Sequence, residues 1–187
     1  MKLIPNLLSA ARLAMAPYLF VLLWRRDYTL ALALCFAAGV TDALDGLLAR
    51  QLRASSRLGA YLDPIADKVL LSGAFLTLAL DGAIPGWLAI LVFGRDLLIL
   101  LMAAAGFLFT NIRSFPPSIW GKLSTAAQIA FVVALLAHYS GFAPASWVDI
   151  LKWTVAALAV VSGAHYLWTA LAILRRDSPE SQLTLSR

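Results

Sequence analysis

Six long apolar stretches separated by short polar connections dominate the sequence. A helix needs roughly 17 or more apolar residues to cross the hydrocarbon core of a bilayer. Stretches of that length cover residues 8–24, 29–49, 58–80, 85–109, 119–139 and 147–174. The connections are too short to hold a second domain. We therefore expect one six-helix transmembrane domain over residues 1–174, opened by a short interfacial segment through Pro5 and Asn6 and followed by a polar tail over 175–187.

Composition supports residence in a membrane. The chain is 61% hydrophobic and 13% charged, with a mean hydropathy of +0.83. Soluble domains are closer to half apolar and a quarter charged, so this chain is too apolar to hide its surface in a soluble fold. The net charge of +5 comes from basic residues at the ends of loops, which does not indicate a nucleic-acid partner. We expect an all-α integral membrane protein.

The basic residues predict the orientation of this domain. Ten of them lie on one side of the six stretches and three on the other, and the richer side is expected to face the cytoplasm. Both termini belong to that side, so we expect a bacterial inner-membrane protein whose carboxylate cluster, described next, faces the cytoplasm. The ten are Lys2, Arg12, Arg50, Arg53, Arg57, Arg113, Lys122, Arg175, Arg176 and Arg187, and the three are Arg25, Arg26 and Lys152.

Four aspartates lie where the second apolar stretch ends and the third begins. Asp42 and Asp45 share one helix face, and Asp63 and Asp67 share a face of the next helix. A short connection makes the two helices antiparallel neighbours, so the acidic faces can converge. Carboxylates that meet at low dielectric repel unless a cation lies between them. Oxygen ligands suit Mg²⁺ or Mn²⁺, and a pair of such ions suits phosphoryl chemistry.

Two other interpretations of these carboxylates remain open. They could form structural ion pairs with Lys68 or Arg95, or they could belong to a membrane cation transporter. The sequence offers few nearby cations for the ion pairs, and a transporter does not explain why Gly46, Ala49, Arg50 and Gly59 accompany the aspartates at fixed intervals. Small residues would let a substrate approach the helix backbone closely, and an arginine fork suits a diphosphate.

The spacing D-x2-D-G-x2-A-R-x8-G-x3-D-x3-D, from Asp42 to Asp67, resembles the signature of the CDP-alcohol phosphatidyltransferases. This resemblance implies an enzyme that binds CDP-diacylglycerol, holds two divalent cations and forms a homodimer. It implies metal binding by Asp42, Asp45, Asp63 and Asp67, and CDP binding by Asp42, Asp45, Gly46, Ala49, Arg50 and Gly59. Asp67 resembles the family's general base, which deprotonates the acceptor hydroxyl before that hydroxyl attacks phosphorus and expels CMP.

The acceptor alcohol is less constrained by the sequence. Arg95, Arg113 and Lys122 are candidate ligands for a phosphate-bearing acceptor. Asp96 lies 100° around the helix from Arg95, so we expect Arg95 to need another partner. The sequence around Asn6 and Arg12 is similar to both phosphatidylglycerophosphate synthases and eukaryotic-type cardiolipin synthases, whereas the Arg-Asp pair looks more like the latter. We expect phosphatidylglycerol as acceptor, with glycerol-3-phosphate as the alternative.

Overall fold

The computed structural model describes residues 3–52, 57–109 and 118–176, with side-chain surroundings for 14–41, 68–102 and 118–169. All of the secondary structure in these ranges is helical. The helices are α1 (Leu3–Trp24), α2 (Tyr28–Leu52), α3 (Arg57–Leu80), α4 (Gly86–Phe109), α5 (Ile119–Tyr139) and α6 (Ala145–Arg176).

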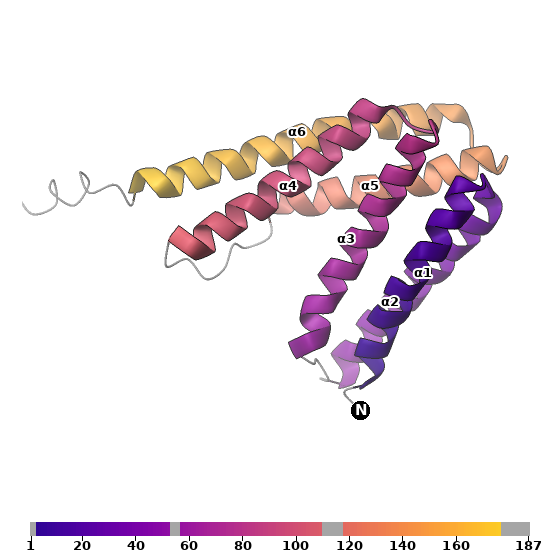
Figure 1. Cartoon of the computed structure of the whole chain (residues 1–187), viewed down its shortest axis with the longest axis horizontal. Coiled ribbons are helices and arrows are strands. Elements are labelled where there is room, and N and C mark those ends of the chain that lie inside the picture. Colours follow the sequence, from indigo (N-terminus) through magenta and orange to yellow (C-terminus); the bar gives the residue numbers. More distant parts are fainter. Residues whose placement is uncertain (1–2, 53–56, 110–117, 177–187) are drawn as a thin grey trace, which may run out of the picture.

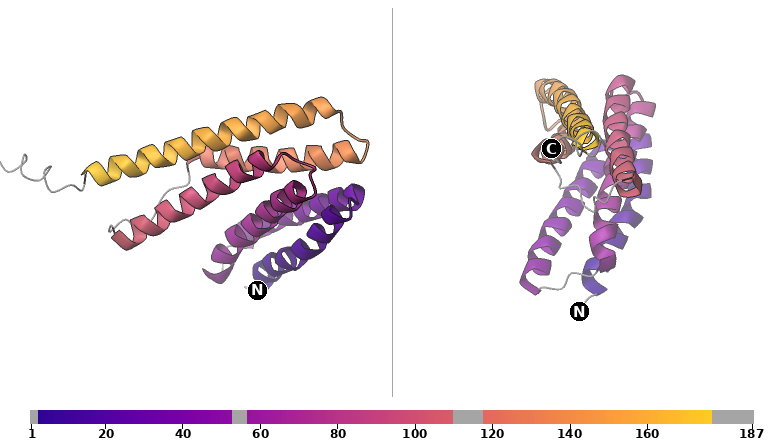
Figure 2. Two further views of the ribbon diagram at one scale, coloured as in Figure 1. Left: turned by 45° about the horizontal axis from the view of Figure 1, so that its top comes forward. Right: turned by 90° about the vertical axis from the view of Figure 1, so that its left-hand side faces the viewer.

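The helices are arranged in two groups of three (Figure 1). In the first group, α1 packs against both α2 and α3. In the second group, α6 packs against both α4 and α5, and the pair α5 and α6 forms a long antiparallel hairpin (Figure 2). Contacts of α2 and α3 with α5, and of α3 with α4, join the two groups.

An apolar core lies where the two groups meet. Phe75 of α3 and Phe131 of α5 are almost fully buried, and their ring centroids lie 5.8 Å apart. Leucines of α1, α3, α4 and α5 surround this aromatic pair. Each fully buried side chain of this size contributes about 1.5–3 kcal/mol relative to exposure to water. The core therefore fixes α5 against the first group of helices.

The outer surface carries many large apolar side chains. Phe36, Ile90 and Trp168 are each more than 70% exposed. A soluble monomer rarely exposes apolar side chains on this scale, whereas lipid tails can cover them. In the described parts of the chain, the stretches Ile119–Tyr139 and Ala145–Thr169 are long and apolar enough to cross a membrane. Shorter apolar stretches lie at Ala14–Trp24, Tyr28–Thr41 and Lys68–Leu80.

The predicted helices are confirmed, and α1 begins at Leu3, before the first predicted apolar stretch. The segment through Pro5 and Asn6 is part of α1, and its place at the membrane interface stays a prediction. Proline is compatible with the first turn of a helix, because its missing N–H would have no partner there. The fifth predicted stretch, 119–139, coincides with α5, and α6 is two residues longer at each end than predicted.

A polar cluster ties the α1–α2 turn to the α3–α4 turn. The Arg26 Nε lies 3.1 and 3.0 Å from the two carboxylate oxygens of Asp81, and Tyr28 donates its hydroxyl proton to Asp81 Oδ2 over 3.2 Å. The Tyr28 ring stacks on Tyr139 of α5, with centroids 4.6 Å apart. The hydrogen bond and charge of Asp81 raise the pKa of the Arg26 guanidinium, which therefore keeps its charge. One carboxylate thus connects two turns that are distant in sequence.

Replacing this carboxylate is expected to weaken the fold. Asp81→Ala removes the acceptor shared by Arg26 and Tyr28, so we expect thermal unfolding in detergent to shift down by several degrees. Asp149→Ala is the matched control, because its ion pair with Lys152 at 2.7 Å joins residues of a single helix and Asp149 is 66% exposed. Such pairs contribute little to stability. Equal unfolding temperatures for the two variants would contradict the tie between the turns.

Candidate active site

The predicted signature residues lie on the two helices expected to carry them. Asp42, Asp45, Gly46, Ala49 and Arg50 belong to the C-terminal part of α2, and Gly59, Asp63 and Asp67 belong to the N-terminal part of α3. Helical backbone places Asp42, Asp45 and Ala49 on one face and Gly59, Asp63 and Asp67 on another. The surroundings of these side chains lie outside the described residues, and the connection 53–56 does as well.

A large cavity begins directly after this signature. It has a volume of about 1010 Å³, and Lys68, the residue following Asp67, lines it. Its walls come from α3, α4, α5 and α6. The polar lining residues are Lys68, Ser72, Arg95, Asp96, Ser118, Lys122, Thr125 and Tyr166, and the larger apolar ones are Val69, Phe93, Leu97, Ile99, Leu100 and Ile129.

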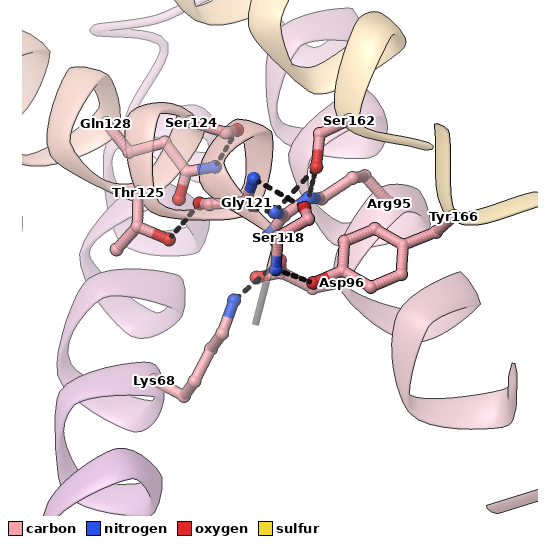
Figure 3. Close-up of polar contacts among 10 residues, drawn as sticks. All are labelled: Lys68, Arg95, Asp96, Ser118, Gly121, Ser124, Thr125, Gln128, Ser162 and Tyr166. Atoms are coloured by element: carbon pink, nitrogen blue, oxygen red, sulfur yellow. Dashed lines mark hydrogen bonds and ion pairs between the residues drawn. The ribbon is translucent and has the colours of Figure 1, made fainter. Parts of the chain in front are cut away.

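Arg95 is a buried charge among the polar lining residues of the cavity, which we call the polar wall. It is only 6% exposed, and its guanidinium donates to groups on two other helices (Figure 3). The Nε and Nη2 donate to Ser162 Oγ of α6 over 3.1 and 2.8 Å, and Nη2 donates to the Gly121 carbonyl of α5 over 3.3 Å. A buried charge is tolerated only when it is paired and hydrogen-bonded, so this network is the condition for placing Arg95 here.

Asp96 completes the network and corrects one expectation. The Arg95 Nη1 lies 2.7 Å from Asp96 Oδ1, although the two residues project in different directions from α4. The long arginine side chain bends back far enough to reach its neighbour's carboxylate. Lys68 of α3 also contacts this oxygen, with its Nζ at 2.6 Å. A single carboxylate therefore serves both cations and links α3 to α4 (Figure 3).

The N-terminus of α5 is held at the same wall. Ser118 is the N-cap, and its Oγ accepts a hydrogen bond from the Gly121 N–H at 3.0 Å. The Ser118 N–H donates in turn to the hydroxyl oxygen of Tyr166 on α6, at 3.2 Å. Capping of this kind typically contributes about 1 kcal/mol. The cap and Tyr166 together fix the first turn of α5, which carries Lys122.

Gly121 allows these groups to approach one another. A Cβ atom at this position would lie 3.1 Å from Arg95 Nη2 and 3.2 Å from the Tyr166 hydroxyl oxygen. Both distances are tighter than ordinary van der Waals contact. A side chain at residue 121 would thus displace either the guanidinium or the phenol.

A second buried polar pair lies further along α5. Gln128 and Ser124 are fully buried, and the Gln128 Nε2 donates to Ser124 Oγ over 3.4 Å. The Gln128 Oε1 has no hydrogen-bond partner within the part of the chain that the structure describes. A buried carbonyl oxygen without a partner is uncommon.

The structure brings together two of the three predicted acceptor residues. Arg95 and Lys122 line the same cavity, whereas Arg113 lies outside the described residues. Sequence reasoning missed Ser162 and Tyr166. Their i, i+4 spacing places two hydroxyl groups on one face of α6, and this is the signal that could have revealed them.

These features, a helical fold with a carboxylate-rich signature beside a basic-walled cavity, agree with the comparison to known proteins. The chain belongs to the CDP-alcohol phosphatidyltransferase family, whose model matches residues 2–165.

Individual relatives carry two different names. The rat (Rattus norvegicus) cardiolipin synthase (CMP-forming) is 33% identical over 183 residues, which cover 87% of this chain and 59% of the rat protein. The CDP-diacylglycerol–glycerol-3-phosphate 3-phosphatidyltransferase of Bacillus subtilis (strain 168) is 31% identical over 192 residues, covering 90% of this chain and 96% of that protein. The enzyme of the same name from Pseudomonas fluorescens is 34% identical, covering 94% and 90%. The chain thus spans less than two thirds of the rat cardiolipin synthase.

The close approach at Gly121 gives a testable prediction. Alanine normally stabilises a helix by about 0.5–1 kcal/mol relative to glycine. Gly121→Ala should nevertheless lower the unfolding temperature, because its methyl group meets Arg95 and Tyr166. Gly163→Ala on α6 is the matched control, since its Cβ would contact Leu98 and Arg95 at an ordinary 3.8 and 3.9 Å. Thermal unfolding in detergent checks the ranking, and a Gly121→Ala variant as stable as Gly163→Ala would refute the packing described.

Proposed function

We propose that the enzyme transfers a phosphatidyl group from CDP-diacylglycerol to phosphatidylglycerol, giving cardiolipin and CMP. The observation that carries the choice of acceptor is the character of the cavity beside the signature. Hydrogen bonds and ion pairs around Gly121 connect most of its polar lining residues, which are Lys68, Arg95, Asp96, Ser118, Thr125 and Tyr166. Apolar side chains from α3, α4 and α5 form most of the remaining lining. Such a cavity suits an amphiphile with an anionic headgroup and acyl chains.

Size and charge support the same choice. Pockets for drug-sized ligands occupy roughly 300–1,000 Å³. At about 1010 Å³, this cavity is larger than a three-carbon phosphate requires. Its lining includes the cations Lys68, Arg95 and Lys122 and the carboxylate of Asp96, so an excess of positive charge remains for a phosphodiester.

The proposed reaction uses the residues of the signature in separate roles. Asp67 would accept the proton of the acceptor hydroxyl, whose oxygen then forms a bond to the phosphorus that carries the diacylglycerol. The bond from this phosphorus to the bridging diphosphate oxygen breaks, and CMP leaves with the electron pair. Gly46, Ala49, Arg50 and Gly59 would hold the CDP group. Positioning of this kind lowers a barrier by removing the entropy of encounter.

The donor set of the signature fits hard divalent cations. Four aspartates on two consecutive helices offer only oxygen ligands, which suit Mg²⁺ or Mn²⁺ rather than zinc. Asp42, Asp45, Asp63 and Asp67 would hold two such ions, which would neutralise the diphosphate when bound. We include this metal dependence in the proposal.

Glycerol-3-phosphate is the second candidate acceptor. The relatives named for that substrate in Bacillus subtilis and Pseudomonas fluorescens match this chain over 96% and 90% of their own length. The cations of the cavity would also suit a phosphomonoester. The two candidates differ in whether acyl chains contribute to binding, and this difference can be measured.

The proposal also includes the setting of the enzyme. We place all six helices across a bacterial inner membrane, with both termini and the signature on the cytoplasmic side, in a homodimer. The charge asymmetry between the two sides supports the orientation. The two long apolar helices support the membrane, and resemblance to the family supports the dimer.

The first test is release of CMP by the full chain purified in detergent. With CDP-diacylglycerol and Mg²⁺ or Mn²⁺, we expect release with phosphatidylglycerol and little with glycerol-3-phosphate or with the deacylated headgroup, glycerophosphoglycerol. Chelation by EDTA should abolish release, and Asp67→Asn should lower it by at least about 100-fold, the lower range for loss of a general base. Release with glycerol-3-phosphate alone would establish the second candidate, and no metal-dependent release with any acceptor would overturn the proposal.

A second test concerns Lys122. Lys122→Met removes a cation that lines the cavity. The KM for phosphatidylglycerol should rise about tenfold, because a charge-assisted hydrogen bond of about 1.4 kcal/mol corresponds to that factor. The KM for CDP-diacylglycerol should stay within about twofold. Lys152→Met is the matched control, because Lys152 pairs with Asp149 and does not line the cavity. A rise in both KM values would contradict a role confined to the acceptor.

A further inference from the structure

We infer that two hydroxyl groups on α6, those of Ser162 and Tyr166, position the acceptor-binding wall, and that Arg95 serves this wall as a fixed support rather than as a free ligand. The inference rests on the proposed function, because it assigns roles within the acceptor cavity. It extends the site to a helix that carries none of the signature residues.

Ser162 acts on Arg95. It is fully buried, and its Oγ accepts from both Nε and Nη2 of the guanidinium. The remaining described bonds of the guanidinium go to the Gly121 carbonyl and to Asp96. Most of the five donors of an arginine are thus committed within the protein. A guanidinium held in this way has little freedom to turn toward a substrate.

Tyr166 acts on α5. It lies one helical turn beyond Ser162, and its hydroxyl oxygen accepts the hydrogen bond of the Ser118 N–H at 3.2 Å. Ser118 caps the helix that carries Lys122 and Thr125, both of which line the cavity. Tyr166 lines the cavity too, so its side chain connects α6 to the N-cap of α5 beside the cavity.

The two hydroxyls therefore fix complementary parts of one wall. Ser162 sets the place of the α4 guanidinium, and Tyr166 sets the start of α5. The small Gly121 lies between them, close to both Arg95 Nη2 and the Tyr166 hydroxyl oxygen. Lys122, which is exposed and lines the cavity, follows Gly121 directly and is then presented to the cavity in a defined position.

The charges of the cavity agree with this division. Asp96 contacts both Arg95 and Lys68, which lowers the net charge that these two cations offer to a ligand. Lys122 makes no ion pair with any other residue that the structure describes. We therefore assign the direct contact with the acceptor phosphate to Lys122 and a positioning role to Ser162, Tyr166 and Arg95.

The test uses Ser162→Ala and Tyr166→Phe in the full chain in detergent. Each variant should raise the KM for phosphatidylglycerol about tenfold and leave the KM for CDP-diacylglycerol within about twofold, since the loss of one positioning hydrogen bond of about 1.4 kcal/mol corresponds to tenfold. Ser162→Thr retains an acceptor oxygen and should recover most of the wild-type value. Thr154→Val is the control, because the Thr154 hydroxyl donates only to the Ile150 carbonyl of its own helix, over 2.8 Å.

A binding measurement separates this inference from the proposed function. The rise in unfolding temperature on adding phosphatidylglycerol or glycerol-3-phosphate, without CDP-diacylglycerol, reports acceptor binding alone. If wild type binds an acceptor but releases no CMP, the proposed reaction fails. The inference still stands in that case if both variants need about tenfold more acceptor for the same rise in unfolding temperature.

Two outcomes would overturn the inference. One is an unchanged acceptor KM and an unchanged thermal response in both variants. The other is a parallel loss of donor binding, acceptor binding and basal stability that Ser162→Thr does not recover, which would show that the hydroxyls only hold the fold together. Absence of any acceptor response in wild type would also count against it, because no acceptor-binding wall would then exist.

Discussion

The burial of one guanidinium determines how the second half of the molecule is assembled. Arg95 is buried among helices that are largely apolar. An unpaired charge in such a place would cost several kcal/mol. Its partners come from α4 itself, α5 and α6, so these helices must meet at one place and in one register. The apolar core around Phe75 and Phe131 brings the helices together, but apolar contacts are not directional. The hydrogen bonds of Arg95 are directional, so they fix the register in which α4, α5 and α6 meet.

Sequence reasoning recovered the helices and the location of the signature, because both depend on local patterns. Apolar stretches of membrane-spanning length predicted helices α1 to α6, and the intervals between the aspartates predicted that the signature lies at the end of α2 and the start of α3. The first helix begins at Leu3, before the apolar stretch that predicted it, and the first turn of a helix accepts a proline such as Pro5. The 100° offset between adjacent helical residues also led us to expect that Arg95 would not pair with Asp96. The two do pair, because the long arginine side chain reaches across that offset.

The cavity that we propose for the acceptor could be predicted only in part. Arg95 and Lys122 stood out because charges are rare in apolar stretches, whereas Ser162 and Tyr166 are ordinary residues for a membrane helix. Their importance arises from contacts between residues 48 and 67 positions apart in the chain. No local pattern specifies such pairings, which depend on how α6 lies against α4 and α5.

Arg95 donates hydrogen bonds to both Ser162 and the Gly121 carbonyl, and this limits how the substrate preference of the protein can change over evolution. Replacing the arginine would leave Ser162 and the Gly121 carbonyl without their donor, so this position resists substitution for reasons of stability. Ala126, Leu97 and Leu100 line the cavity through apolar groups and belong to no polar network in the described part of the chain. Substitutions there can alter the shape of the cavity while the supporting wall stays intact. New acceptor preferences are therefore expected to arise on the apolar side of the cavity.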